Sequence, residues 1–166
     1  MSKKSKTAII DTGFLIALVN GKHPFHEHAK KFYQYFLEND VSMILSTIVL
    51  SEFAIKQPIT DLPLSNFRIL PFNIDHAAKC FEVNFTKYQN KAHTKHVIKD
   101  DFKILSQAIV EQADLFVTRD NEFISKVIEP CRVHFKYKLR SILIDNGKEM
   151  YFGGTQLSIL DPPPET

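Results

Sequence analysis

Short, mostly apolar segments alternate along this chain with segments of helical periodicity. Residues 7–10 and 114–118 are short and apolar, which predicts buried strands. Residues 12–19 predict a short apolar helix, and residues 25–37 and 100–113 carry apolar side chains at helical spacing. Strands that alternate with helices are typical of a parallel sheet covered on both faces. We therefore predict an α/β fold, a three-layer α/β/α arrangement around a central, mostly parallel sheet.

Three further segments complete the expected set of elements. Residues 41–53 predict a strand followed by a helix, with Ser46 or Thr47 as its cap. Residues 131–137 predict a last strand. Residues 142–152 contain an Asp-Asn-Gly turn between apolar runs, which predicts a β-hairpin near the C-terminus.

The overall composition is that of an ordinary globular domain. The length of 166 residues suits one domain, and the net charge of +2 permits nucleic-acid binding without indicating it. The two cysteines lack the spacing of a metal site, so we expect a reduced compartment. Asp11 interrupts the first apolar stretch, so neither a signal peptide nor a membrane span is predicted. We expect a cytoplasmic protein without a membrane partner.

Two acidic residues follow directly after predicted buried strands. Asp11 comes after the strand at 7–10, and Asp120 comes just after the strand at 114–118. The carboxyl ends of parallel strands meet at one edge of a sheet, where α/β proteins place their ligands. A buried carboxylate is costly unless it is paired or binds a metal ion. Both side chains are therefore expected to face one functional cleft.

Two more acids lie on predicted helices. Glu52 shares a helix face with Ile48 and Ile55, so we expect its carboxylate to point toward the interior. Asp100 and Asp101 open a helix together. Asp101 is in line with the apolar stripe of that helix, so it is the one expected to face the cleft.

Each of these acids alone has a simpler interpretation. An Asp after a strand is usually a helix cap, a Glu on a helix usually forms an ion pair, and acids at a helix start favour its dipole. Four carboxylates directed to one cleft would repel one another strongly. A divalent cation removes that repulsion, and oxygen ligands suit Mg²⁺ or Mn²⁺. The sequence therefore predicts a metal site of the type used in phosphodiester hydrolysis, formed by Asp11, Glu52, Asp101 and Asp120.

The order of these segments resembles a known family. The segments that carry the resemblance are Asp11-Thr12-Gly13-Phe14, then residues 46–53, 101–108 and 117–123. Over residues 7–127 the chain resembles the PIN domain family of Mg²⁺/Mn²⁺-dependent ribonucleases, which includes the toxins of VapBC toxin–antitoxin pairs. The resemblance implies a five-stranded parallel sheet. It also implies that the four acids are both metal ligands and catalytic residues, with Thr12 and Thr118 as supporting hydroxyls.

The resemblance also implies a function. It implies an endoribonuclease that hydrolyses RNA phosphodiester bonds with Mg²⁺ or Mn²⁺ as cofactor, with RNA as substrate, an antitoxin protein as partner and a homodimer as assembly. Whether such an enzyme is a toxin or an RNA-processing enzyme stays open. The alternative is a catalytically silent PIN-like module that binds RNA or a protein. Four retained, mutually repelling carboxylates argue against that alternative.

Basic residues provide candidate RNA contacts. Lys91, Lys95 and Lys99 recur every four residues before Asp101, as a phosphate-binding patch or as a solvated face. Arg119 is a candidate to contact a phosphate or to pair with a neighbouring acid.

The expected domain organisation follows from these segments. It consists of a flexible basic N-terminus (1–6), a PIN-like nuclease domain (7–137), a C-terminal hairpin extension (138–160) and a disordered tail (161–166).

Overall fold

The computed structural model describes residues 5–83 and 97–153. The expectations for Lys91, Lys95, the tail at 161–166 and most of the basic N-terminus fall outside these residues. Within the described part of the chain, no helix is long and apolar enough to span a membrane.

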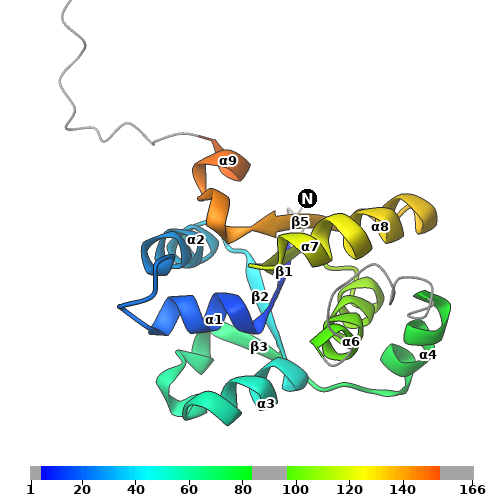
Figure 1. Ribbon diagram of the computed structural model, residues 1–166, viewed down its shortest axis with the longest axis horizontal. Helices are drawn as coiled ribbons and strands as arrows, with labels where there is room; N and C mark the ends of the chain where they lie inside the picture. Colours follow the sequence, from blue (N-terminus) through cyan, green and yellow to red (C-terminus); the bar gives the residue numbers. More distant parts are fainter. Residues whose placement is uncertain (1–4, 84–96, 154–166) are drawn as a thin grey trace, which may run out of the picture.

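A five-stranded parallel sheet forms the centre of the molecule, as predicted (Figure 1). Its order is β3-β2-β1-β4-β5, and every neighbouring pair is parallel. The strands are β1 (Thr7–Ile10), β2 (Ser42–Ser46), β3 (Phe67–Leu70), β4 (Leu115–Thr118) and β5 (Arg140–Leu143). The chain winds outward from β1 in one direction and from β4 in the other. The boundary between β1 and β4 is therefore the point at which a sheet of this kind opens a ligand crevice at its carboxyl edge.

Helices cover both faces of this sheet, which confirms the three-layer arrangement. The helix α1 packs against α2 on one side, while α6 lies on the other side with α4 packed outside it (Figure 1). The α-helices are α1 (Thr12–Val19), α2 (His26–Glu38), α3 (Thr47–Lys56), α4 (Ile74–Val83), α6 (Val97–Val110), α7 (Asn121–Phe123), α8 (Glu129–Phe135) and α9 (Glu149–Phe152). Short 3₁₀ turns lie at Ile59–Asp61, Leu64–Asn66 and Ile144–Asn146, and a π-helical turn lies at Ile124–Ile128.

The core is formed by the central strands and by phenylalanines from the surrounding helices. The apolar side chains of β1 are fully buried, as expected for a strand covered on both faces. Aromatic rings fill the space between sheet and helices, and the largest buried ones are Phe14, Phe32, Phe36, Phe53, Phe102 and Phe116. Burying side chains of this size contributes about 1.5–3 kcal/mol each. The core thus fixes the strand ends from which the acids project.

The predicted last strand at 131–137 is wrong, because most of this segment is helix α8. Pro130 lies in the first turn of α8, where its fixed φ suits a helix and its missing N–H is no loss. Lys136 ends the helix in the left-handed region at φ 57°. The last strand is β5 instead.

The predicted hairpin at 142–152 is also wrong. Residues 142 and 143 end β5, and the chain then forms a 3₁₀ turn and the short helix α9. The hydroxyl of Tyr151 accepts hydrogen bonds from the Leu143 N–H (3.0 Å) and from the Asn146 amide (3.3 Å). Phe152 stacks on Tyr35 of α2, with ring centroids 4.2 Å apart. These contacts turn the chain back onto α2, so the residues after β5 form no second strand beside it. Among the described residues, β5 is therefore an edge strand of the main sheet.

Candidate active site

Asp11 and Asp120 lie at the carboxyl ends of two hydrogen-bonded strands. The strands β1 and β4 are neighbours, and the Asp11 N–H continues their ladder by donating to the Val117 carbonyl oxygen at 3.0 Å. Asp120 follows Thr118, the last residue of β4. The parallel register therefore brings the two acids to the same point on the sheet edge.

The hydroxyl of Thr118 connects these two acids. It donates to Asp11 Oδ2 at 2.7 Å and accepts from the Asp120 N–H at 3.0 Å. Asp11 also caps α1, since its Oδ1 accepts from the Thr12 N–H at 2.7 Å. Asp120 caps α7, where its Oδ1 accepts from the Phe123 N–H at 2.8 Å. Both acids are helix caps and still have oxygen lone pairs that face the cleft.

Glu52 reaches the same place from α3. Ser46 caps this helix, accepting from the Ile48 N–H at 3.1 Å. The Thr12 hydroxyl donates a short hydrogen bond to Glu52 Oε2. The predicted apolar face around Glu52 is wrong in part, because Ile55 is 84% exposed. Glu52 is therefore half-buried at the mouth of a cleft, where Thr12 orients it.

Asp101 lies on α6 and is the most enclosed of the helical acids. It is 9% exposed, and no hydrogen bond to its carboxylate occurs within the described residues. Its neighbour Asp100 points elsewhere and pairs with Lys103 at 2.7 Å. The alignment of Asp101 with the apolar residues of the helix therefore correctly predicted that Asp101, and not Asp100, is enclosed.

An open pocket of about 360 Å³ brings the four acids together. The side chains of Asp11, Glu52, Asp101 and Asp120 all line it, together with Thr12, Gly13, Ile16, Ile55 and Lys56. Lys56 is the one basic residue among these lining residues. Sequence reasoning did not single out Lys56, although its position one helical turn after Glu52 indicates that both side chains share a face.

The acids of this pocket strongly disfavour each other's ionisation. Burial, and then the charges of Asp11, Glu52 and Asp120, raise the pKa of Asp101 to about 9. Burial also raises the pKa of Asp11, although hydrogen bonds from Thr118 and Thr12 oppose that shift. The pKa of Glu52 is raised by burial as well, against the hydrogen bond from Thr12. The pocket thus concentrates negative charge that a bound cation would compensate.

The donor set of the pocket fits a hard divalent cation, because these side chains offer only oxygen ligands. Their spacing is not that of a preformed coordination shell. Within residues 5–83 and 97–153, no three acidic, histidine or cysteine side chains lie close enough together to hold one ion. The pocket therefore has the right chemistry for Mg²⁺ or Mn²⁺, and its carboxylates would have to move inward to bind it.

Of the predicted RNA contacts, Arg119 is the one whose side chain the structure describes, and it does not line this pocket. The guanidinium of Arg119 pairs with Asp145, with Nε 2.8 Å from Oδ1 and Nη2 3.2 Å from Oδ2. Of the two interpretations of Arg119, the structure therefore shows the pair with a neighbouring acid. Lys99 belongs to α6, but its side chain is outside what the structure describes, as are Lys91 and Lys95.

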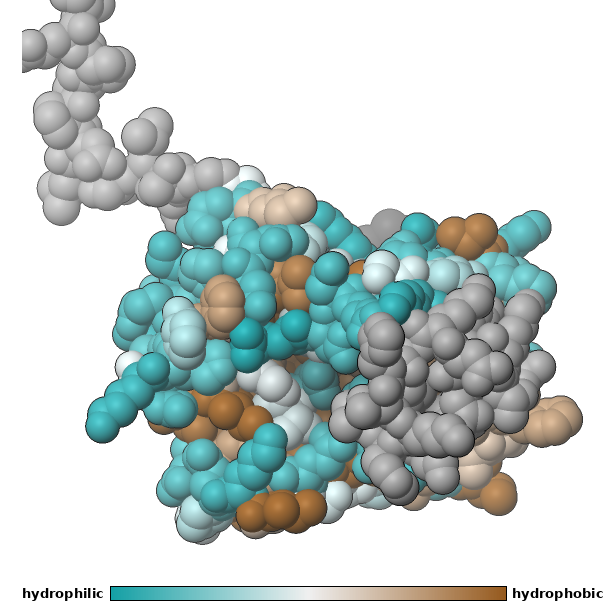
Figure 2. Space-filling view, viewed as in Figure 1, coloured by the Kyte–Doolittle hydropathy of each residue, from teal (hydrophilic) through white to brown (hydrophobic). Residues whose placement is uncertain are grey.

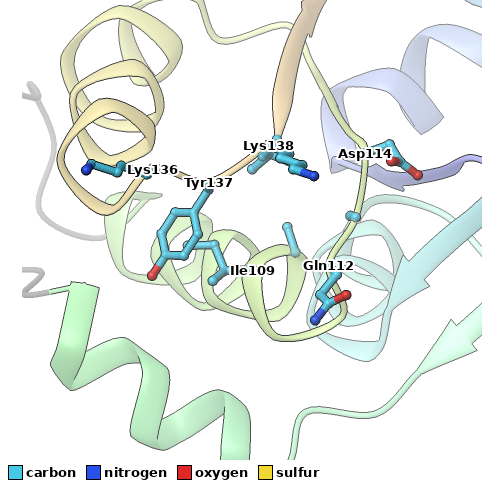
Figure 3. A pocket seen from close by; sticks show the side chains of 9 residues that line it. Ile109, Gln112, Asp114, Lys136, Tyr137 and Lys138 are labelled. Atoms are coloured by element: carbon cyan, nitrogen blue, oxygen red, sulfur yellow. The ribbon is translucent and has the colours of Figure 1, made fainter.

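A second pocket lies at the opposite, amino edge of the sheet. Its volume is about 500 Å³, and it lies between the end of α6 and the segment that leads into β5 (Figure 3). Tyr137 and Ile109 lie at its centre, with Lys138 and Asp114 to one side. The carboxylate of Asp114 has a structural role, since its Oδ2 accepts hydrogen bonds from the N–H and the hydroxyl of Thr7. Among the described residues that line this pocket, one is an acid, in contrast to the four acids at the carboxyl edge.

The visible face of the molecule is predominantly hydrophilic (Figure 2). Outside the part drawn in grey, apolar residues on this face are scattered among hydrophilic ones. Charge and polarity, rather than a broad apolar surface, therefore dominate this side of the molecule.

The sequence comparison identifies the family. Residues 8–128, which include all four acids, match the family described as the PIN domain. The chain belongs to the PIN domain family. The match ends before β5, so the last strand of this PIN domain and the helix α9 lie beyond it. A comparison with curated proteins gives no match.

Several solved structures have a similar fold. VapBC2 from Rickettsia felis, bound to promoter DNA, has a TM-score of 0.58 at 21% identity, covering 81% of this chain and 98% of that one. FitAcB from Neisseria gonorrhoeae has a TM-score of 0.53 at 20% identity, covering 72% and 92%. VapC20 from Mycobacterium tuberculosis, a sarcin–ricin-loop-cleaving toxin, has a TM-score of 0.54 at 16% identity, covering 71% and 93%. At these identities the likeness establishes the fold of this PIN domain.

Proposed function

We propose that this PIN domain is an Mg²⁺- or Mn²⁺-dependent endoribonuclease. The observation that carries the proposal is the pocket at the carboxyl edge, which is lined by four acids from different elements. Such a set raises its own pKa values and gains from a divalent cation. PIN domains are typically nucleases, and one protein of similar fold is described as cleaving the sarcin–ricin loop.

In this proposal, the acids share one task and the threonines support it. Asp11, Glu52, Asp101 and Asp120 would hold the cation and would orient a water for in-line attack on the RNA phosphodiester. Thr12 and Thr118 fix the carboxylates of Glu52 and Asp11 through their hydroxyls. When bound, Mg²⁺ or Mn²⁺ lowers the pKa of water and offsets charge on the phosphate. The products are a 3′-hydroxyl and a 5′-phosphate.

Binding of Mn²⁺ and its effect on cleavage test this proposal. We expect isothermal titration calorimetry to show Mn²⁺ binding to the full chain, and fluorescent RNA to be cleaved with Mn²⁺ but not with excess EDTA. Absence of binding at millimolar Mn²⁺ would contradict the proposal. It would favour the alternative, a module that binds RNA or a protein without cleaving it.

We further propose that the protein is the toxin of a toxin–antitoxin pair and forms a homodimer. The support for the pair is that a solved structure of similar fold, from Klebsiella pneumoniae, is a toxin–antitoxin complex. The homodimer rests on the family resemblance alone. Expression in bacteria should then arrest growth, and Asp11→Asn should relieve the arrest. Growth that continues with the wild-type protein, at equal expression, would point to an RNA-processing role instead.

Lys56 is expected to contribute to RNA binding at the pocket. It is the basic residue that lines the acidic pocket, and its charge lowers the pKa of the nearby Glu52. Lys56→Glu should raise KM for RNA by about 5- to 20-fold, since a lost phosphate contact and a repulsive charge together are worth about 1–2 kcal/mol. Lys22→Glu, an exposed lysine that does not line the pocket, is the control. An unchanged KM for Lys56→Glu would exclude this contact.

A further inference from the structure

A network around Arg119 ties the C-terminal segment to the acidic pocket. Two nitrogens of the Arg119 guanidinium contact the two oxygens of Asp145, at 2.8 and 3.2 Å. The guanidinium carbon lies 4.5 Å from the ring centroid of Phe25, and Nη1 lies 3.1 Å from Nε2 of His23. The guanidinium is therefore fixed on its edge by a carboxylate and on its face by an aromatic ring.

The position of Arg119 gives this network a functional consequence. Arg119 directly precedes Asp120 in the chain, and Asp120 is the residue that caps α7. Its stem also packs on Gly13, because a Cβ placed at Gly13 would lie only 3.3 Å from the Arg119 Cβ. Gly13 follows Asp11 and Thr12, and it lines the acidic pocket itself. Arg119 thus contacts Gly13, which lies two residues after Asp11, and it is itself the residue before Asp120.

Asp145 approaches from a segment beyond the family match. It lies in the 3₁₀ turn Ile144–Asn146 after β5, 26 residues from Arg119 along the chain. A second contact holds the same turn, since His28 Nδ1 lies 3.1 Å from the Ile144 carbonyl oxygen. The turn is therefore anchored to α2, and it offers Arg119 a carboxylate whose position is fixed.

We propose that Asp145 is a positioning residue for Asp120, acting through Arg119. The proposal deepens the proposed function and rests on it, because it assigns a residue outside the matched region to the geometry of the nuclease site. Most surface ion pairs contribute little, since two flexible side chains must be ordered in water. This pair differs, because it has two contacts, both side chains are about 30% exposed or less, and one partner stacks on an aromatic ring. Loss of the pair frees the backbone that carries Asp120.

Variants of the full chain test the proposal. Asp145→Asn keeps the size of the side chain and removes its charge, and Arg119→Lys keeps the charge and removes the two-point contact. Each should lower kcat for RNA about 10- to 100-fold with KM changed less than about threefold, and weaken Mn²⁺ binding about tenfold, the range for residues that orient metal ligands. The double variant should have about the same kcat as the single variant with the lower kcat, because both substitutions break the same Arg119–Asp145 contact.

Glu129→Gln is the matched control. Glu129 also forms a partly exposed pair with an arginine, Arg132, and contacts β5 through Ser141, but it does not line the acidic pocket. We expect it to lower the melting temperature about as much as Asp145→Asn does, and to keep the wild-type kcat. An equal loss of kcat in Glu129→Gln would show that general destabilisation is responsible, and it would overturn the proposal.

Amide hydrogen exchange provides a readout that does not depend on cleavage. The Phe123 N–H is bonded to Asp120 Oδ1, so its exchange reports the placement of Asp120. We expect Phe123 to exchange about tenfold faster in Asp145→Asn and at the wild-type rate in Glu129→Gln. If Phe123 exchange, Mn²⁺ affinity and kcat all match the wild type in Asp145→Asn, the proposal is wrong. If the wild-type chain cleaves no RNA, the proposed function fails, while Phe123 exchange still decides whether Asp145 positions Asp120.

Discussion

Asp11→Asn is expected to reduce RNA cleavage at least about 100-fold while the protein stays folded. Hydrogen bonds from the Thr12 N–H and the Thr118 hydroxyl hold the two carboxylate oxygens of Asp11 in place. We therefore do not expect another acid of the pocket to take over its position. Asparagine retains the carbonyl oxygen that caps α1, but it loses the negative charge offered to the cation. Losses of 10²–10³ in kcat are typical when a preorganised electrostatic contact is removed.

Single-turnover cleavage with saturating Mn²⁺ measures this effect, and thermal unfolding monitors the fold. Asp100→Asn is the matched control, because Asp100 is a nearby acid that pairs with Lys103 and does not line the pocket. We expect its cleavage rate to stay within about threefold of the wild-type rate. Full activity in purified Asp11→Asn would remove Asp11 from the catalytic site.

The sequence predicted the positions of the acids well because each depends on local periodicity and on topology. Strands that are almost entirely apolar had to be buried on both faces, and parallel strands bring their carboxyl ends together. This was sufficient to place Asp11 beside Asp120. The helical stripe was sufficient to separate Asp101 from Asp100, since one is enclosed and the other pairs with Lys103.

Contacts between distant segments could not be predicted in the same way. No local pattern indicates that Asp145 approaches Arg119, or that Tyr151 folds the C-terminal residues back to Leu143. The Asp-Asn-Gly sequence suits a hairpin turn, but a hairpin also needs a second strand to pair with. Here β5 pairs with β4, and Phe152, which follows β5 in the chain, packs on Tyr35 of α2. Tertiary packing thus overrode the local turn signal.

Asp101→Asn is expected to stabilise the protein in the absence of divalent metal, and increasingly so as the pH rises. In the folded protein the pKa of Asp101 is about 9, whereas its ordinary value is 3.8. The folded state therefore holds a proton that the unfolded state releases near pH 4. The free energy of unfolding of the wild type must fall as the pH rises from about 4 toward about 9. Asparagine has no such proton, so this part of the pH dependence disappears.

Thermal unfolding in EDTA, at about pH 5 and about pH 8, measures the effect. Three pH units would correspond to about 4 kcal/mol at about 1.4 kcal/mol each. Because the neighbouring carboxylates share this titration, we expect the variant to be more stable at the higher pH by roughly half of that, about 2 kcal/mol. For a chain of this size, that corresponds to a rise of roughly 4–8 °C in Tm. At the lower pH the difference should be much smaller. Asp100→Asn, which changes an acid already paired with Lys103, should keep most of the pH dependence of the wild type, because Asp100 makes the smallest contribution to the raised pKa of Asp101.

Adding Mn²⁺ should reverse the order of stability. A ligand that binds only the folded state stabilises it by about 2.7 kcal/mol at 100 times its Kd. The wild type should gain this stabilisation at about pH 8, because the cation compensates the charges that burial and the neighbouring carboxylates oppose. Asp101→Asn should gain little, because it has lost one of the ligands. If Mn²⁺ stabilised both proteins equally, Asp101 would not be a ligand, and the raised pKa would reflect burial alone.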